Sequence, residues 1–255
     1  MIHLTKLGEH AALLEIDNPP ANALGSAARR AFHAHLDALE ASDAIRALVV
    51  TGKSRAFCSG DDLKEQEAAQ AHGAEARKRQ LGEFSGLLDR IEALRMPVIA
   101  AVNGFCLGGG LELALCCDIR IASTQASFVC AGVNVGLMAS VYRLPRLIGV
   151  ARAKHMLLTG LPHDAETAER FGLVTAIYEP DLLLAEAETL AERIATRAPL
   201  SVEATKRMAT RAPELSREDA AEAMRDELAT LVTSADHAEA LAAFKEKRAP
   251  VFKRK

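Results

Sequence analysis

The sequence predicts an α/β fold with a helical C-terminal region, and three observations support this prediction. Strand-like segments alternate with helical patterns along most of the chain, which is typical of α/β domains. Beyond about residue 196, only helical patterns remain. Apolar residues make up 49% and charged residues 25% of the 255 residues, as in ordinary globular proteins. We therefore expect a core, residues 1–195, followed by a helical region, residues 196–255.

Five short segments rich in Val, Ile, Leu and Ala are expected to form strands. Apolar and β-branched side chains in runs of this length favour positions in a sheet. The segments are AALLEI (11–16), ALVVTG (47–52), PVIAAVNG (97–104), CDIRIAS (117–123) and GLVTAIYE (172–179).

Helical patterns lie between these strands and after them. Segment 26–42 begins with Ser26 and has apolar residues three to four positions apart, and segment 74–95 is a long amphipathic pattern that stops before Pro97. No linker rich in Gly, Pro or Ser precedes the helical tail, so the tail is expected to pack on its own core or on a neighbouring subunit. The tail helices are predicted at 199–210, 216–232 and 235–248.

The composition argues against nucleic-acid and membrane partners. The net charge is −3, and the chain has no Trp and only two Tyr with which to stack on bases. No apolar stretch reaches 18 residues, and the N-terminus lacks the pattern of a signal peptide. Five cysteines without CxxC spacing indicate reduced, mostly buried thiols rather than a metal site. We expect a cytoplasmic protein without a bound metal.

The segment RAFCSGDDLKE (55–65) follows a predicted strand and contains a glycine at the strand exit. Gly60 allows a positive φ and a close approach of the backbone to a ligand, so the next N–H groups are able to face a cavity. The alternative is an ordinary tight turn with an Asp cap.

The segment NGFCLGGGLELALCCD (103–118) leads from a strand through three consecutive glycines into an apolar helix. It lacks the spacing of a dinucleotide-binding fingerprint and the Lys of a phosphate loop. Free N–H groups at the start of a helix suit negative charge that develops on an oxygen. The alternative function of the glycines is close packing of the helix on a strand.

Glu112 lies in the first turn of this helix among apolar neighbours. Burial raises the pKa of a carboxyl group and a helix N-terminus lowers it, so such a residue next to an oxyanion site is a candidate general base. The alternative is a glutamate that only interacts favourably with the helix dipole.

AFCSGDDL and NGFCLGGGLELALCCDIRIAS resemble the two signature segments of the crotonase (enoyl-CoA hydratase/isomerase) superfamily. The resemblance covers nearly the whole chain, because further segments follow in the same order. They are IDNPPANAL (16–24), LPRLIGVARAKHMLLTG, AERFGLVTAIYE and the C-terminal AFKEKRAPVFK.

This resemblance implies a spiral of ββα units and a helical C-terminal trimerisation region. It also implies an acyl-CoA thioester as substrate, bound with its carbonyl oxygen between the N–H groups of Asp61 and Gly109. No separate cofactor is expected, since the substrate carries coenzyme A, and the expected assembly is a homotrimer or a dimer of trimers. The residues that match the CoA-binding segments are Ala21, Ala23, Asp61, Asp62, Leu63, Lys64, Gly108 and Gly109.

One catalytic acid of the family is absent. Hydratases of the superfamily use two glutamates; one matches Glu112, but the position of the other is Gly132, and the loop after Gly136 is about three residues shorter than usual. A glycine at position 132 also permits a backbone conformation that is closed to other residues.

Four explanations for the missing acid remain open. Glu112 acts alone, or a substitute comes from Cys130, Tyr142 or the helix 74–95. Alternatively, the chain catalyses another reaction of the superfamily, such as isomerisation, decarboxylation, C–C cleavage or thioester hydrolysis, or it binds acyl-CoA with little catalysis.

Overall fold

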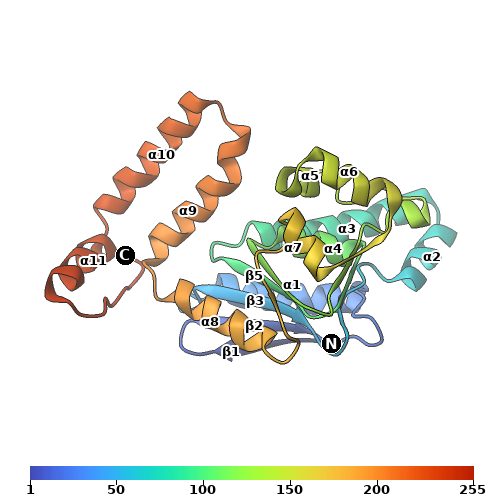
Figure 1. Cartoon of the computed structure of the whole chain (residues 1–255), viewed down its shortest axis with the longest axis horizontal. Helices are drawn as coiled ribbons and strands as arrows, with labels where there is room; N and C mark the ends of the chain where they lie inside the picture. The colour runs from blue at the N-terminus through green and yellow to red at the C-terminus, as the bar shows by residue number, and fades with distance from the viewer.

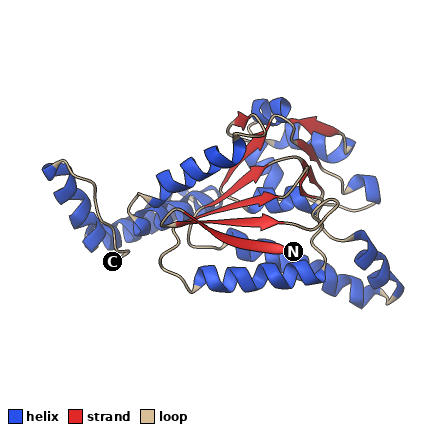
Figure 2. Cartoon of the chain, turned by 90° about the horizontal axis from the view of Figure 1, so that it is seen from below, coloured by secondary structure: helices blue, strands red, loops and turns tan.

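Two β-sheets form the centre of the computed structural model, which describes residues 1–255. The larger sheet has the order β1-β2-β3-β5-β7-β10 and the smaller one β4-β6-β8-β9 (Figures 1 and 2). Neighbouring strands are parallel except for the pairs β1–β2 and β8–β9. The strands of the larger sheet are β1 (Ile2–Leu7), β2 (Ala11–Ile16), β3 (Ala47–Gly52), β5 (Val98–Val102), β7 (Ile119–Ser123) and β10 (Ile177–Tyr178).

A repeated unit relates the two sheets. Each of the consecutive pairs β3–β4, β5–β6 and β7–β8 places one strand in the larger sheet and the next in the smaller sheet, and helices follow each pair. This arrangement agrees with the expected ββα units. The smaller sheet consists of β4 (Ala56–Cys58), β6 (Phe105–Leu107), β8 (Ser127–Val129) and β9 (Pro162–Asp164).

Helices cover both faces of the larger sheet. One face packs on the main apolar core with α1, and the other face packs on α8, whose Ala187 and Ala191 lie in a cluster with Val49 and Ile99 (Figure 1). The helices before the tail are α1 (Ser26–Glu40), α2 (Leu63–Ala71), α3 (Ala74–Glu92), α4 (Gly109–Cys116), α5 (Arg143–Ile148), α6 (Val150–Thr159), α7 (Ala165–Phe171) and α8 (Leu183–Ala195), with the 3₁₀ turn η1 (Val133–Val135).

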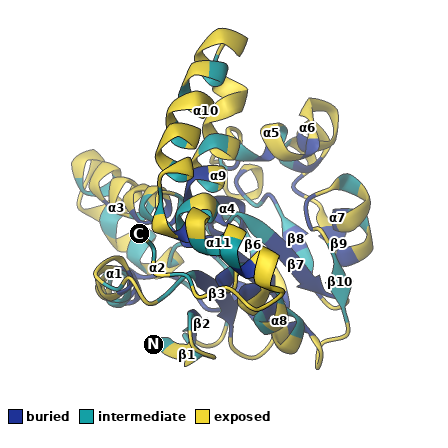
Figure 3. Cartoon of the chain, turned by 90° about the vertical axis from the view of Figure 1, so that its left-hand side faces the viewer, coloured by how far each residue is buried: buried dark blue, intermediate teal, exposed yellow.

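The C-terminal helices leave this core. The segments α9 (Pro199–Arg211), η2 (Ala212–Glu214), α10 (Arg217–Val232) and α11 (Ala235–Glu246) extend from the sheets toward one side of the molecule (Figure 1). No residue of α10 is buried, and most of its surface is exposed (Figure 3). Helix α8, which ends at Ala195, still packs on the sheet.

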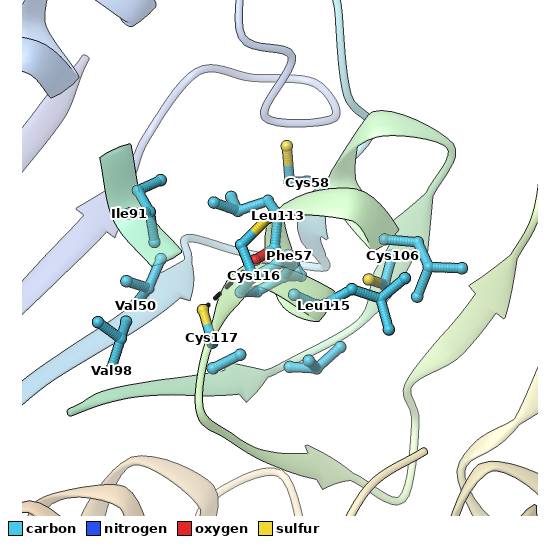
Figure 4. Packing of buried hydrophobic residues seen from close by; sticks show 14 of the residues in the cluster. Val50, Phe57, Cys58, Ile91, Val98, Cys106, Leu113, Leu115, Cys116 and Cys117 are labelled. Atoms are coloured by element: carbon cyan, nitrogen blue, oxygen red, sulfur yellow. Dashed lines mark hydrogen bonds between the residues drawn. The ribbon is translucent and has the colours of Figure 1, made fainter. Parts of the chain in front are cut away.

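The core beneath α4 is apolar and rich in thiols. Leu113, Leu115 and Cys116 of α4 belong to one apolar cluster with Phe57 and Ile91, and the Cys117 thiol donates to the Leu113 carbonyl (Figure 4). All five cysteines are free and buried, as the sequence predicts. Complete burial of a Leu or Phe side chain stabilises a fold by about 1.5–3 kcal/mol, so this cluster fixes α4 firmly on the strands.

The structure corrects one predicted strand. Of segment 172–179, only Ile177–Tyr178 is extended. Gly172 ends α7 in the left-handed region, with φ of 81°, and the N–H groups of Leu173 and Val174 turn back to the Ala168 carbonyl. The strands predicted at 97–104 and 117–123 are present but shorter, and the three tail helices are confirmed. None of the helices combines the length and the apolar character that a bilayer crossing requires.

Candidate active site

Two strand exits meet at Gly60 and Gly109. Gly60 has φ of 91°, and a Cβ atom built on it would lie 2.5 Å from the Gly109 nitrogen. The two backbones therefore approach this closely only because Gly60 has no side chain. The Asp61 N–H donates to no backbone carbonyl. The first helical hydrogen bond of α4 runs from the Glu112 N–H to the Gly108 carbonyl at 3.1 Å, so the Gly109 N–H has no acceptor within the helix. Two N–H groups are thus available at this junction.

The three consecutive glycines have different structural roles. Gly108 turns the chain with φ of 49°. A Cβ at Gly109 would lie 2.6 Å from Phe84 Cζ of α3, and a Cβ at Gly110 would lie 1.9 Å from the Cys58 carbonyl oxygen. Close packing therefore explains Gly110. The Gly108 N–H donates to the Val129 carbonyl at 3.0 Å, so this glycine serves the turn. Gly109 leaves its N–H at the helix start and lets Phe84 of α3 approach it.

The Asp61 carboxylate joins three helices around the first loop. Its side chain is 8% exposed, and its oxygens accept from Arg29 of α1 at 2.6 Å, Gln66 of α2 at 3.1 Å and Gln80 of α3 at 3.0 Å. The Arg29 side chain is only 4% exposed. The side chain of Asp61 therefore holds α1, α2 and α3 together around this loop.

The residues expected along CoA lie around the same loop. The Ser59 N–H donates to the Ala21 carbonyl at 3.0 Å, which fixes the turn that also contains Ala23. Asp62 caps α2 by accepting from the N–H groups of Lys64 and Glu65. Leu63 and Lys64 are exposed.

Glu112 is held by two groups from the segment that follows β8. The Ser140 N–H donates to its Oε1 atom, and Arg143 Nη1 lies 3.5 Å from its Oε2 atom. The Glu112 side chain is 14% exposed. Ser140 is itself buried and has φ of 60°, in the left-handed region.

The structure contradicts the expectation of a glycine-only backbone at position 132. Gly132 has φ of −53° and ψ of −52°, which any residue adopts. A Cβ here would instead lie 3.0 Å from the Leu137 carbonyl oxygen and 3.1 Å from the Ala139 nitrogen. The constraint on this position is contact with the following loop. Asn134, the nearest polar side chain, points away and donates to the Gly160 carbonyl at 2.9 Å.

The proposed substitutes for the missing acid occupy different environments. Burial and the charge of Glu112 raise the pKa of Cys130 to about 12, so this residue is a thiol at neutral pH. The Tyr142 hydroxyl donates to Glu214 of the C-terminal region, and Arg146 lies 3.8 Å from its ring centroid. In helix α3, Glu92 binds Arg143 at 2.6 Å.

Two cavities adjoin this region, and neither is lined by Gly60 or Gly109. A cavity of about 850 Å³ separates the core from α9; its lining includes Glu92, Cys116, Tyr142, Arg143, Ile194 and Val202. An apolar cavity of about 360 Å³ lies beside Cys130 and Gly132 and is also lined by Leu137, Ala139 and Leu158.

The C-terminal residues 244–255 are basic, and two of their six Lys and Arg side chains form ion pairs within the chain. Arg248 binds Glu239 and Glu246, and Arg254 binds Asp43 and Glu203. No group of three His, Cys, Asp or Glu side chains is arranged to hold a metal ion.

Comparison with known proteins agrees with this fold. The family model described as "Enoyl-CoA hydratase/isomerase" matches residues 8–255. The chain is 35% identical to a crotonyl-CoA hydratase of Syntrophomonas wolfei, over 96% of this chain and 95% of that protein. It is 39% identical to an (E)-benzylidenesuccinyl-CoA hydratase of Thauera aromatica, over 82% of each chain.

A solved structure supports the same assignment. The crystal structure of an enoyl-CoA hydratase from Bacillus anthracis superimposes with a TM-score of 0.95 at 31% identity, covering 100% of this chain and 99% of that one. This match confirms the predicted crotonase-like α/β fold. The chain belongs to the enoyl-CoA hydratase/isomerase family.

Proposed function

We propose that the protein adds water to the double bond of an enoyl-CoA thioester, with Glu112 as its single catalytic carboxylate. The observation that carries this proposal is the junction of Gly60 and Gly109, where two backbone N–H groups are available one helical turn from Glu112. The N–H groups of Asp61 and Gly109 bind the thioester oxygen. They stabilise the enolate that forms during addition.

The reaction needs two proton movements, and one base is able to perform both. The Glu112 carboxylate takes a proton from water as the water oxygen bonds to Cβ. The electron pair of the double bond moves toward the thioester oxygen and forms the enolate. Glu112 then returns the proton to Cα, which completes the addition of water. Each oxyanion donor contributes about 3 kcal/mol of transition-state stabilisation.

The relatives and the exposed segments support the substrate class. Both named relatives are hydratases of CoA esters. Leu63 and Lys64 are exposed next to the junction, as a CoA-binding segment requires. Ala21, Ala23, Asp62 and Gly108 complete the proposed CoA site. We also propose a homotrimer or a dimer of trimers, because α10 and α11 expose apolar side chains such as Met224, Leu228 and Phe244.

A second candidate is binding of acyl-CoA without hydration. The observation that favours it is Gly132, where the second glutamate of similar hydratases is absent and a Cβ would lie 3.0 Å from the Leu137 carbonyl oxygen. The other reactions of the superfamily share the same oxyanion site and differ in how the proton is moved.

The test is turnover of a panel of enoyl-, 3-hydroxyacyl- and malonyl-type CoA esters, followed by mass spectrometry. Hydration of an enoyl-CoA, a gain of one water, supports the proposal. Conversion of other esters without hydration indicates another reaction of the family. Binding by calorimetry without any conversion identifies the protein as an acyl-CoA binder.

A further inference from the structure

The loop after η1 packs closely against Gly132, the position of the missing glutamate. The Leu137 N–H donates to the Gly132 carbonyl at 2.8 Å, and a Cβ at position 132 would lie 3.0 Å from the Leu137 carbonyl oxygen and 3.1 Å from the Ala139 nitrogen. A side chain at position 132 therefore requires this loop to move by a few tenths of an ångström. The glycine and the path of the loop fit each other.

The same loop delivers two donors to Glu112. The Ser140 N–H faces Oε1, and the Arg143 guanidinium faces Oε2 at 3.5 Å. Each oxygen of the carboxylate thus has its own positively polarised neighbour. A carboxylate with both oxygens engaged loses rotational freedom about its terminal side-chain bonds, and this fixes the direction in which it accepts a proton.

Arg143 is in turn fixed from helix α3. Its Nη2 atom lies 2.6 Å from Glu92 Oε2 and 3.2 Å from Asp89 Oδ1, and its Nε atom lies 3.2 Å from the same Glu92 oxygen. The planar guanidinium carries these contacts in a rigid fork. Arg143 lies on α5, and its cation therefore connects this helix to α3 through Glu92 and to α4 through Glu112.

Arg143 remains charged in this environment. Burial lowers the pKa of its guanidinium. The hydrogen bond to Glu92 and the charges of Glu92 and Glu112 outweigh burial, so the pKa lies above its ordinary value. Arg143 is therefore a permanent counter-charge and not a proton donor, and any role in the reaction acts through Glu112.

We propose that Arg143 is a positioning residue. Together with the Ser140 N–H, it orients the Glu112 carboxylate in a site that lacks the second glutamate. This inference rests on the proposed role of Glu112 as the general base. It extends that role by assigning the orientation of the base to the short loop and to α3. The family signature alone contains none of these contacts.

The experiment compares Arg143→Gln, Arg143→Lys and Glu92→Gln with a matched control, Arg146→Gln. Arg146 lies on the same helix and also pairs with a carboxylate, Glu214, but it does not contact Glu112. Two reactions are measured: hydration of the best enoyl-CoA of the panel, and exchange of the Cα protons of its saturated analogue with D₂O. Exchange requires the base and the oxyanion site but no addition of water.

We expect Arg143→Gln to lower kcat for both reactions about 10- to 100-fold with KM changed less than about threefold, as for a misplaced catalytic group. Arg143→Lys recovers part of this loss because it keeps the charge but not the fork. Glu92→Gln loosens Arg143 and leaves Glu112 intact, so it gives a smaller loss in kcat. Arg146→Gln remains at the level of the unmutated protein. Thermal unfolding of each variant shows whether it is folded.

The outcomes separate the two proposals. If the protein does not hydrate enoyl-CoA, but its Cα-proton exchange rate falls in Arg143→Gln, the hydratase function is wrong and the positioning role is supported. Hydration or exchange that is unchanged in Arg143→Gln overturns the positioning role, as does a loss confined to KM or an equal loss in Arg146→Gln. If the unmutated protein catalyses neither reaction, Glu112 moves no proton and both proposals are wrong.

Discussion

At the scale of single residues, the carboxylate of Asp61 and its backbone N–H have separate tasks. The N–H is available at the junction with Gly109, whereas the carboxylate accepts from Arg29, Gln66 and Gln80. Both Arg29 and Asp61 are buried, so neither charge is compensated by water. The conformation of the loop that contains Gly60 and Asp61 therefore depends on this ion pair.

Replacement of Asp61 by Asn tests this dependence. The variant removes the negative charge from beside Arg29 and directs an amide group at the two glutamine donors. Breaking a buried ion pair from one side costs about 3 kcal/mol, and we expect a loss of this size in the free energy of unfolding in urea. The matched control is Asp62→Asn, which keeps an efficient cap for α2 and changes stability by less than about 0.5 kcal/mol. If the two variants have equal free energies of unfolding, the ion pair between Arg29 and Asp61 does not stabilise the fold.

The residues around Glu112 illustrate what a single sequence is able to predict. Glu112, Gly60 and Gly109 were identified because glycine at a strand exit and a glutamate in a first helical turn are local patterns. Arg29, Gln80, Ser140 and Arg143 were not, because their contacts join segments 19 to 51 residues apart. At position 132 the sequence shows that the second glutamate is absent and allows a glycine-only backbone, but the observed constraint is contact with the loop that follows.

At the scale of secondary-structure elements, the length of a strand determined whether the sequence predicted it. The strands at 11–16 and 47–52 are long, apolar and present as expected. The strands β4, β6, β8 and β9 have three residues each, too few to show a period of two. The second sheet was therefore expected only through the family resemblance. The strand predicted from residue 172 begins only at Ile177, because Gly172 closes the preceding helix.

The C-terminal segment is another element that is held by side chains. Glu239 of α11 accepts from Arg248 at 2.5 and 2.9 Å and from the Val251 N–H at 2.7 Å. The hydrogen bond from Arg248, followed by that from Val251, lowers the pKa of Glu239 to about 2 from an ordinary 4.5. The ionised carboxylate therefore fixes residues 248–251 against the helix.

This pKa predicts how the segment responds to acid. The folded pKa is depressed, so the contribution of Glu239 is complete above about pH 4.5 and is lost as the pH falls toward about 2. We expect protection of the Val251 amide from hydrogen exchange, relative to amides of β3, to decrease across this window. In Glu239→Gln, protection of this amide should be low at every pH. Equal protection in both proteins would contradict the proposed attachment.

At the scale of the whole molecule, the C-terminal helices expose an apolar surface. Met224, Leu228 and Val232 are four residues apart on one face of α10, and Phe244 of α11 is 84% exposed. No residue of α10 is buried in the single chain, although the helix has 16 residues (Figure 3). An exposed apolar surface of this kind is typical of an interface between copies of a chain.

Assembly is testable by mass. Light scattering at micromolar concentration should give three or six times the chain mass of 27.3 kDa. Leu228→Glu places a charge on the apolar face of α10 and should shift the population toward single chains. The control Glu222→Gln, on the same helix, should not. A monomeric mass for the unmutated protein would rule out the proposed trimer.

The central claim is that Glu112 is the only catalytic carboxylate of this site. The most direct measurement is the hydration rate of Glu112→Gln with the best enoyl-CoA of the panel, together with calorimetric affinity for a saturated acyl-CoA. Gln keeps the size of the side chain and most of its hydrogen bonds but accepts no proton. We predict that kcat falls about 100-fold or more while affinity changes little, as expected for the loss of a general base. Full turnover by Glu112→Gln would contradict the claim and place the base elsewhere.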